Sequence, residues 1–485
     1  MAGFELRHMD PHRTVGEEWA LGPIYNGLVT YKPLSAVDEY TVIPDLAESW
    51  EISRDGLTYT FKIRQGATFH NGDPVTTEDV VFSLERLRAK EADAAKAYLL
   101  DAVDKIAAKG NAAIGLVLRE PYVPLLTLLG QPWPVIVSKR TVEENNGSIK
   151  QVEAGSGPFK LNTYERGARF LMQKFPDYWD RSKPYLDQLE YLIMPDYAAR
   201  TAAFRAGQID IHDWFRGADV LQIPKSNPDA VMERWTGFFP IQVAFNLAKP
   251  PFNEVRVRRA LSLALDRWAI AKSVNVIGPG YLAAPLPRSV GGKWIIPEEK
   301  IENTLPYYKR DVERAKRLLA EAGFPNGFKA SLTIRRDLLN YVSMAEIFKE
   351  NAKEIGVDLE IRALEVGAQT RALVTRDFEI AGSARATPVG DPDDALWGSF
   401  HAGAAQNYAN VSDRKLDELL EKQRRIADEH ERKKILDEIQ TYLTDQAFWL
   451  FISDADYASA WHPYVKNFKR TFSRHVALEE AWLER

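Results

Sequence analysis

Hydrophobic and polar residues alternate strictly over residues 57–64. One series is Leu57, Tyr59, Phe61 and Ile63, and the other is Thr58, Thr60, Lys62 and Arg64. This alternation is typical of a half-buried strand. Thr76 stands three residues before Asp79, and apolar residues follow at positions 80, 81, 84 and 87, which predicts a helix that begins with a capping box. The strand and the helix together predict an α+β unit, which we expect to end where residues 155–158 interrupt all periodicity.

The second half of the chain has helical and strand patterns in turn. Asn253 is placed to cap a helix with Val257, Leu261, Ala264, Leu265 and Trp268 on its inner face, and Asp311 is placed to cap another helix that ends at Gly323. A strand pattern at 328–334, a helix pattern at 345–355 and a strand pattern at 357–361 follow with short connections. This order predicts a right-handed parallel βαβ crossover. The expected fold class is therefore α/β, with mixed sheets flanked by helices and with more than one sheet.

Length and composition narrow the class of protein. The 485 residues correspond to about three domains at roughly 150 residues each. Sixty-three basic and 68 acidic residues give a net charge of -5 without a basic block, so we expect no nucleic-acid partner. The chain has no Cys, which excludes disulfides, thiolate nucleophiles and iron–sulfur ligation. No apolar run reaches about 18 residues, so we expect a soluble protein.

No catalytic motif is present in the sequence: there is no phosphate-binding loop, no zinc-protease motif and no nucleophile elbow. Residues 278–283 match a dinucleotide fingerprint by spacing, but Pro279 favours a plain loop. His8 and His12 are four residues apart, and we interpret them as an ordinary surface pair. Asp391, Asp393 and Asp394 are not a calcium loop, because Leu396 stands where that loop needs Gly. A helix cap or an acidic turn lining a cleft is the favoured interpretation. We expect neither a cofactor nor a metal.

Aromatic residues beside Gly, Pro, Asp or Gln are candidates for walls of a ligand site. They are Trp19, Trp133, Trp214, Trp397 and Tyr408. Most of the twelve Trp belong in hydrophobic cores by size alone. Stiff aromatic walls nevertheless suit a site that encloses a ligand without reacting with it.

Several motifs resemble one family, the extracytoplasmic solute-binding proteins of ATP-driven (ABC) importers in the dipeptide, oligopeptide, nickel and opine group, known as family 5. The motifs are Ile43-Pro44-Asp45-Leu46-Ala47-Glu48-Ser49-Trp50, Gly155-Ser156-Gly157-Pro158-Phe159, Ala206-Gly207-Gln208-Ile209-Asp210, Val255-Arg256-Val257-Arg258-Arg259-Ala260-Leu261 and Ala320-Glu321-Ala322-Gly323-Phe324-Pro325. They extend over almost the whole chain.

This resemblance implies a two-lobed periplasmic-binding-protein-like fold of type II, with an extra subdomain on the first lobe and a solute held between lobes that close on it. It implies a first lobe made of residues 1–45, 155–243 and 452–485, an α+β subdomain at 46–154 and a second lobe at 244–451. It also implies a monomer in the periplasm that works with a membrane permease and an ATPase. The chain opens Met-Ala-Gly-Phe without an export leader, and the resemblance implies that a signal peptide has been removed.

Two departures from the family pattern concern the ligand. Peptide-binding members usually carry an Asp three residues before an acidic-Pro pair, where it holds the peptide's amino end, and commonly a Trp six residues before it. Here the pair is Asp391-Pro392, and those positions are Pro388 and Arg385. A free ammonium group buried there would lack its partner, whereas Arg385 can hold a carboxylate in a bidentate contact. The alternative is that Arg385 pairs with Asp391 or Asp393 and never meets the ligand.

The leading hypothesis is therefore a solute-binding component of an ABC importer that captures an opine, a sugar-like or another anionic solute and performs no chemistry. The candidate contacts are Trp19, Trp133, Trp214, Arg385, Asp391, Trp397 and Tyr408. Within the same class, the alternatives are a di- or oligopeptide and a metal chelate. From another class, a carboxylate-based hydrolase and an interaction protein with an exposed apolar patch are the alternatives.

Overall fold

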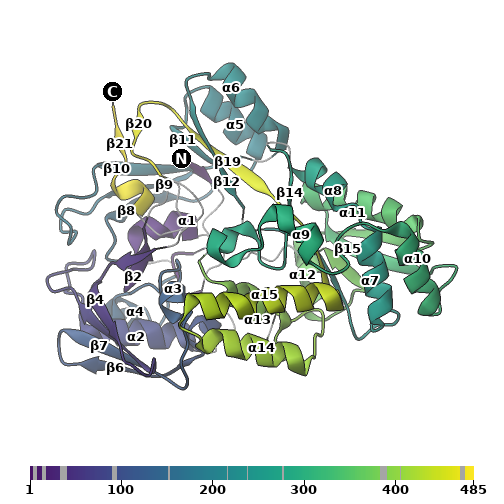
Figure 1. Cartoon of the computed structure of the whole chain (residues 1–485). Helices are drawn as coiled ribbons and strands as arrows, with labels where there is room; N and C mark the ends of the chain where they lie inside the picture. Colours follow the sequence, from purple (N-terminus) through teal and green to yellow (C-terminus); the bar gives the residue numbers. More distant parts are fainter. Residues whose placement is uncertain are drawn as a thin grey trace. The chain divides into compact units, whose positions relative to one another are not determined.

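The computed structural model describes residues 1–3, 8–13, 18–32, 41–89, 96–150, 153–215, 217–237, 239–275, 278–382, 390–404, 406–469 and 476–484. The chain forms two compact units. Unit 1 contains residues 1–233 and 458–485, and unit 2 contains residues 234–457 (Figure 1). The chain passes between the units within strand β12 (Val231–Thr236) and within strand β19 (Asp456–Trp461). The finer division into a subdomain and lobe segments stays a prediction.

The first part of unit 1 is an α+β layer, as the alternating pattern predicts. Its antiparallel sheet has the order β4-β5-β7-β6, and helix α2 packs on it. The bounds are β4 (Ala47–Ile52), β5 (Thr58–Ile63), α2 (Thr77–Arg88), β6 (Val103–Lys109) and β7 (Ala113–Leu118). The β5 side chains Tyr59, Phe61 and Ile63 are buried while their neighbours are not. Thr76 and Asp79 form the predicted capping box of α2, so both local predictions are confirmed.

The rest of unit 1 is built around a second four-stranded sheet, of order β1-β10-β9-β8, and a three-stranded sheet, of order β11-β19-β12. The further elements are β1 (Ala2–Gly3), α1 (Glu18–Leu21), β2 (Val29–Tyr31), β3 (Val42–Pro44), α3 (Leu125–Leu129), α4 (Lys139–Glu144), β8 (Phe159–Glu165), β9 (Arg169–Lys174), β10 (Gln188–Ile193), α5 (Tyr197–Arg205), β11 (Ile211–Phe215), α6 (Ile223–Ser226), β20 (Val465–Lys466), α16 (Val476–Glu479) and β21 (Trp482–Leu483). Segments from both chain ends share one hydrophobic core, which includes Tyr25, Phe159, Tyr191 and Trp461.

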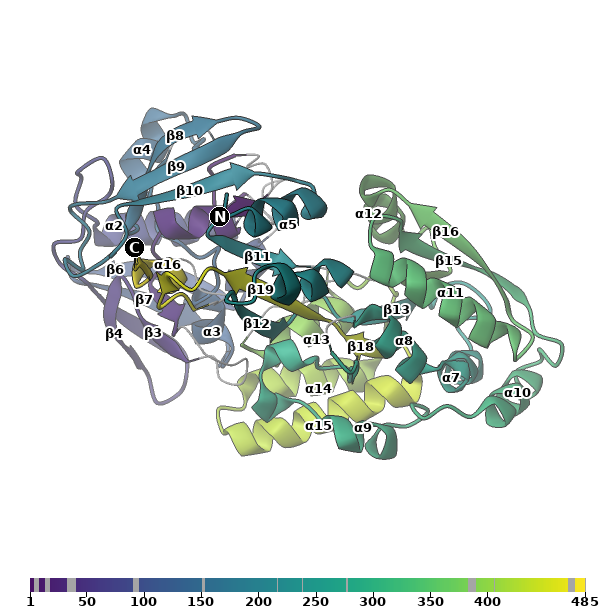
Figure 2. The ribbon, with the colours of Figure 1, turned by 90° about the horizontal axis from the view of Figure 1, so that it is seen from above.

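Unit 2 has one six-stranded mixed sheet of order β14-β18-β13-β17-β15-β16. The strands are β13 (Ile241–Phe245), β14 (Tyr281–Leu282), β15 (Lys329–Arg335), β16 (Asp358–Leu364), β17 (Ile380–Gly382) and β18 (Trp449–Asp454). β15 and β16 pair in parallel and are joined through helix α11 (Leu339–Lys353), so the predicted βαβ unit is confirmed (Figure 2). Within the described residues the dinucleotide-like segment contributes only the short edge strand β14.

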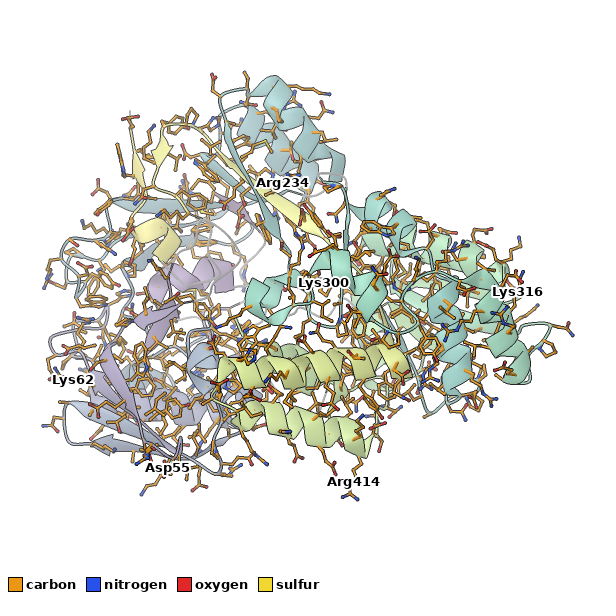
Figure 3. The ribbon with its side chains drawn as sticks, in the orientation of Figure 1. Asp55, Lys62, Arg234, Lys300, Lys316 and Arg414 are labelled. Atoms are coloured by element: carbon orange, nitrogen blue, oxygen red, sulfur yellow. The ribbon has the colours of Figure 1, made fainter. Side chains whose placement is uncertain are left out.

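Side-chain alternation separates two cores on the two faces of this sheet. Ile241, Val243 and Phe245 belong to the first core, whereas Ala244 belongs to the second. Helices α7 (Val255–Ala264), α8 (Arg267–Val274), α10 (Val312–Glu321) and α11 contribute to the first core, and helices α13 (Pro392–Phe400), α14 (Arg414–Arg425) and α15 (Glu429–Gln446) contribute to the second. α9 (Glu298–Thr304) and α12 (Val366–Val374) complete the unit. Polar side chains such as Lys316 and Arg414 extend outward from these amphipathic helices (Figure 3).

Helix ends in unit 2 test the predicted caps. Asp311 caps α10 by accepting from the Arg314 amide at 2.9 Å, as predicted. The prediction for α7 was wrong in two respects. Its cap is Glu254 rather than Asn253, and Trp268 lies in the next helix with 37% of its surface exposed. A turn at Leu265 and Asp266 separates the two helices, which the shared apolar spacing concealed.

Candidate functional site

The carboxyl edge of the unit 2 sheet is where a ligand site is expected from topology. β15 and β17 are adjacent and parallel. The chain leaves β15 toward β16 on one side, but it leaves β17 through α13–α15 toward β18 on the other side. Ligands of open α/β sheets bind where the connections diverge in this way. The segment that follows β17 contains Arg385, which lies outside the described residues.

Helix α13 is the next element after β17 in the chain, and it begins with three acidic residues. Asp391 is its N-cap and accepts a hydrogen bond from the Asp393 amide at 2.8 Å. Asp393 and Asp394 lie in the first turn, and all three side chains are buried. Carboxylates at a helix N-terminus are stabilised by the helix dipole. The helix-cap interpretation of this acidic turn is therefore confirmed.

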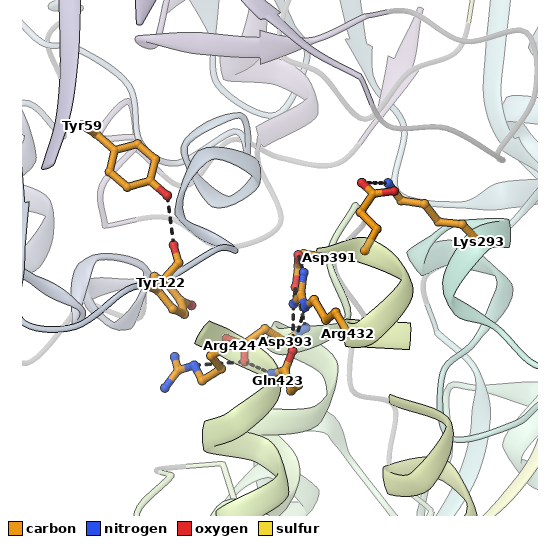
Figure 4. A network of polar contacts seen from close by, with 9 residues as sticks. Tyr59, Tyr122, Lys293, Asp391, Asp393, Gln423, Arg424 and Arg432 are labelled. Carbon is orange, nitrogen blue, oxygen red and sulfur yellow. Dashed lines mark hydrogen bonds and ion pairs between the residues drawn. The ribbon is translucent and has the colours of Figure 1, made fainter. Parts of the chain in front are cut away.

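Two of these carboxylates are neutralised by arginines from α14 and α15 (Figure 4). Arg432 binds both oxygens of Asp391 at 2.7 Å, and its guanidinium also donates to Gln423 Oε1. The Gln423 amide donates to Asp393 at 2.6 Å, and Arg424 lies 3.1 Å from the same carboxylate. Because Asp391 already holds a bidentate ion pair, a ligand contact through its carboxylate would compete with Arg432.

Trp397 is held between two flat side chains. The Arg424 guanidinium carbon lies 3.7 Å from the centroid of the Trp397 ring, and the His401 ring stacks on Trp397 at 3.6 Å. Two groups at these distances cannot share one face of an indole, so they cover opposite faces. Among the described residues both faces of the indole are thus covered, which leaves its edge for a ligand contact. Tyr408 is half-buried against Leu373, Phe378 and Ala381.

The other candidate aromatic residues lie in unit 1. Trp133 is 5% exposed within the core of the α+β layer, and the Lys96 ammonium lies 3.7 Å from its ring. Its Nε1 is buried with no hydrogen-bond partner among the described residues. Trp19 is in α1 and Trp214 is in β11, and both side chains lie outside the described part of the structure. A ligand contact through any of these seven candidates stays a prediction.

Several signature residues have structural roles. Asp45 is 1% exposed and accepts from the Asn26 side chain at 2.6 Å and from the Gly27 amide at 2.8 Å. A β-carbon on Gly155 would lie 2.1 Å from the Ile24 carbonyl oxygen, which requires glycine there. These motifs therefore identify the fold rather than a ligand.

The interpretation of His12 as a surface residue was wrong. The side chain is 1% exposed, and its Nδ1 accepts from Arg86, which can only donate, so its Nε2 carries the hydrogen donated to the Val135 carbonyl. Burial, with Arg86 adding to the effect, lowers the pKa of His12 to about 4. The described residues contain no group of three His, Asp or Glu side chains arranged to hold a metal ion.

Sequence reasoning missed Arg432, Gln423 and Arg424. Charged residues on a polar helix normally face solvent, so none of them stood out. One signal was available, because Arg432 stands four residues before the buried Leu436 and so continues the apolar stripe of α15. A charge on such a stripe indicates a buried partner.

Comparison with known proteins gives a consistent result. Residues 41–407 match the family model of bacterial extracellular solute-binding proteins, family 5 Middle. Heme-binding protein A of Haemophilus influenzae is 30% identical over 92% of this chain and 84% of its own length. The dipeptide-binding protein of Escherichia coli is 27% identical over 92% of this chain and 86% of its own. The structure of AgaA from A. tumefaciens R10, in complex with agropinic acid, superposes with a TM-score of 0.84 at 27% identity, covering 99% of this chain and 97% of AgaA.

Proposed function

The chain belongs to the bacterial extracellular solute-binding proteins of family 5, so it is the substrate-binding component of an ABC importer. We propose that it captures an anionic solute of the opine or acidic-sugar type. The family assignment and the two-lobed α/β fold class predicted from the sequence are confirmed. Members of the family are extracytoplasmic, bind small solutes and work with a permease and an ATPase. Among the described residues we find no helix with the length and apolar character needed to cross a bilayer.

One observation carries the choice of solute: two of the three carboxylates at the start of α13 are paired with arginines of unit 2. Arg432 holds Asp391 by both oxygens, and Arg424 and Gln423 contact Asp393. An ammonium group needs a carboxylate that is not already paired. Pro388 stands at the position of the usual amine anchor and Arg385 stands six residues before Asp391, so an ammonium group lacks its usual carboxylate there while an anion gains a guanidinium.

The similarity to AgaA supports the same choice, because its structure contains agropinic acid. We propose that Arg385 binds the anionic end of the solute, and that the aromatic candidates, with the edge of Trp397, cover the remainder. The protein is proposed to act as a monomer and to release the solute chemically unchanged.

A di- or oligopeptide is the second candidate, because the dipeptide-binding protein of Escherichia coli matches 92% of the chain. In that case another acidic group must hold the amino end of the peptide. Asp394, which lies buried in the first turn of α13, is our candidate for that group.

Calorimetric titration separates these solutes. We expect agropinic acid to bind the wild-type protein at least about 100-fold more tightly than unblocked Met-Leu. Heme is titrated as a third solute, and we expect it to bind more weakly than agropinic acid. Arg385→Ala should weaken agropinic acid binding by roughly 10- to 100-fold, as expected for loss of one charge-assisted contact. Arg414→Ala is a matched control, because its side chain is 93% exposed. Tight binding of Met-Leu that Arg385→Ala leaves unchanged would contradict the proposal.

A further inference from the structure

Gln242 in β13 lies at the carboxyl edge of the unit 2 sheet. β13 is antiparallel to β17, and Val243 pairs with Gly382, the last residue of β17. Gln242 is therefore one position beyond the end of β17, beside the point where the two parallel strands β15 and β17 send the chain in opposite directions. On its other side Gln242 pairs with Phe451 of β18.

The side chain of Gln242 is on the face covered by α13. Val243 belongs to the first core and Ala244 to the second, so alternation places Gln242 on the side of Ala244. Phe451 belongs to the same second core, where its ring lies 6.2 Å from that of Phe400 in α13. Gln242 is thus the polar end of an otherwise apolar row next to the acidic helix.

Gln242 is 7% exposed, yet its side-chain amide has no hydrogen-bond partner among the described residues. Enclosed polar atoms without a partner include Gln131 Oε1 and Gln440 Oε1 but neither amide atom of Gln242, so its amide end keeps a path to solvent. Gln369, which is buried to a similar extent, instead donates to the Gly382 carbonyl at 3.1 Å. An amide that reaches solvent and has no protein partner can exchange its contacts with water for contacts with a bound solute.

We propose that the Gln242 amide determines specificity by exchanging hydrogen bonds with a hydroxyl group of the bound solute. An amide offers two donors and an acceptor without charge, which matches a hydroxyl that both donates and accepts. The assignment rests on the function proposed above and goes beyond it by naming the neutral part of the solute and the residue that recognises it.

The test uses Gln242→Met, which keeps the length of the side chain and removes its polar atoms. The melting temperature of the unliganded variant is expected to equal or exceed that of the wild type, because no internal hydrogen bond is lost. Gln369→Met is the matched control and should lower the melting temperature, because it leaves the Gly382 carbonyl without its donor. Gln242→Met should also weaken agropinic acid binding about 10-fold or more, as measured by calorimetry.

The two proposals fail in different ways. If the wild type binds agropinic acid and Gln242→Met binds it equally well, or if Gln242→Met melts as early as Gln369→Met, the role of Gln242 is overturned and the solute class stands. If the wild type does not bind agropinic acid, the solute class is overturned. The role of Gln242 then depends on the melting temperature of Gln242→Met alone: a lower value rejects the proposed role, and an unchanged or higher value supports it.

Discussion

Asp454, the last residue of β18, shows how burial alters a single carboxyl group. It is 1% exposed, its Oδ2 accepts from the Arg288 amide at 3.0 Å, and its Oδ1 has no hydrogen-bond partner among the described residues. The Arg288 guanidinium binds Asp456 at 2.5 Å. Burial, with Asp456 adding to its effect, raises the pKa of Asp454 to about 6 against the opposing effect of Arg288. Asp454 therefore resists ionisation although a cation is close.

Asp454 should make the protein less stable as the pH rises. Its pKa is raised from 3.8 to about 6, so between these values the folded state binds more protons than the unfolded state. The contribution of Asp454 to the free energy of unfolding is complete below pH 4 and lost above pH 6, a change of roughly 3 kcal/mol. Urea unfolding of the wild type and of Asp454→Asn should show this change in the difference between their unfolding free energies.

His12 and His212 provide the internal control for that measurement. Burial lowers the pKa of each to about 4, so their contribution has the opposite sign and is lost as the pH falls from 6.5 to 4. Both residues are unchanged in Asp454→Asn, so their effect cancels in the difference. A difference that stays constant from pH 4 to pH 7 would show that Asp454 ionises normally.

Arginine side chains join helices in unit 2 by binding groups at the ends of neighbouring helices. Arg258 and Arg259 of α7 donate to the carbonyl groups of Gln446 and Asp445, which end α15 and have no partner within that helix. Arg432 joins α15 to the N-cap of α13. Arg258 and Arg259 of the signature Val255-Arg256-Val257-Arg258-Arg259 thus have a structural explanation, because a guanidinium can satisfy several carbonyls at a helix C-terminus.

The pairing of α13 with α15 should appear as strong coupling between Asp391 and Arg432. Arg432→Met leaves a buried carboxylate unpaired and should cost about 3–5 kcal/mol. Asp391→Asn keeps an N-cap side chain, so in the double variant the second substitution should restore part of that loss. Unfolding free energies of the four proteins give the coupling, which we expect to be roughly 2 kcal/mol. Additive effects would mean that the ion pair contributes little to the joining of the helices.

At the scale of the whole molecule, the two units differ in the number of chain segments that form them. Unit 2 is the continuous segment 234–457 and contains both cores of its sheet, whereas unit 1 needs segments from both chain ends. In unit 1, Ile211 of β11 pairs with Trp461 of β19, so the C-terminal segment completes a sheet begun much earlier in the chain. A compact unit with its own core can fold alone.

Residues 234–457 expressed alone should therefore fold, whereas residues 1–233 without 458–485 should not. Circular dichroism and cooperative urea unfolding distinguish these outcomes, and adding a peptide of residues 458–485 to the second fragment serves as the control. Non-cooperative unfolding of 234–457 would mean that its cores depend on the rest of the chain.

The sequence by itself determined the elements whose causes are local: the β5 strand, the capping box of α2, the Asp311 cap and the βαβ order of unit 2. Period and capping act over a few residues, so they can be read without a fold, and the signature motifs identified the family. The tertiary structure alone decided the partners of Asp391 and Trp397, the burial of His12 and the lack of a partner for the Gln242 amide among the described residues. Asp391 and Arg432 are 41 residues apart. Such contacts form only when packed helices bring distant charges together. The apolar stripe of α15 marks Arg432 as buried, but it does not identify Asp391 as the partner.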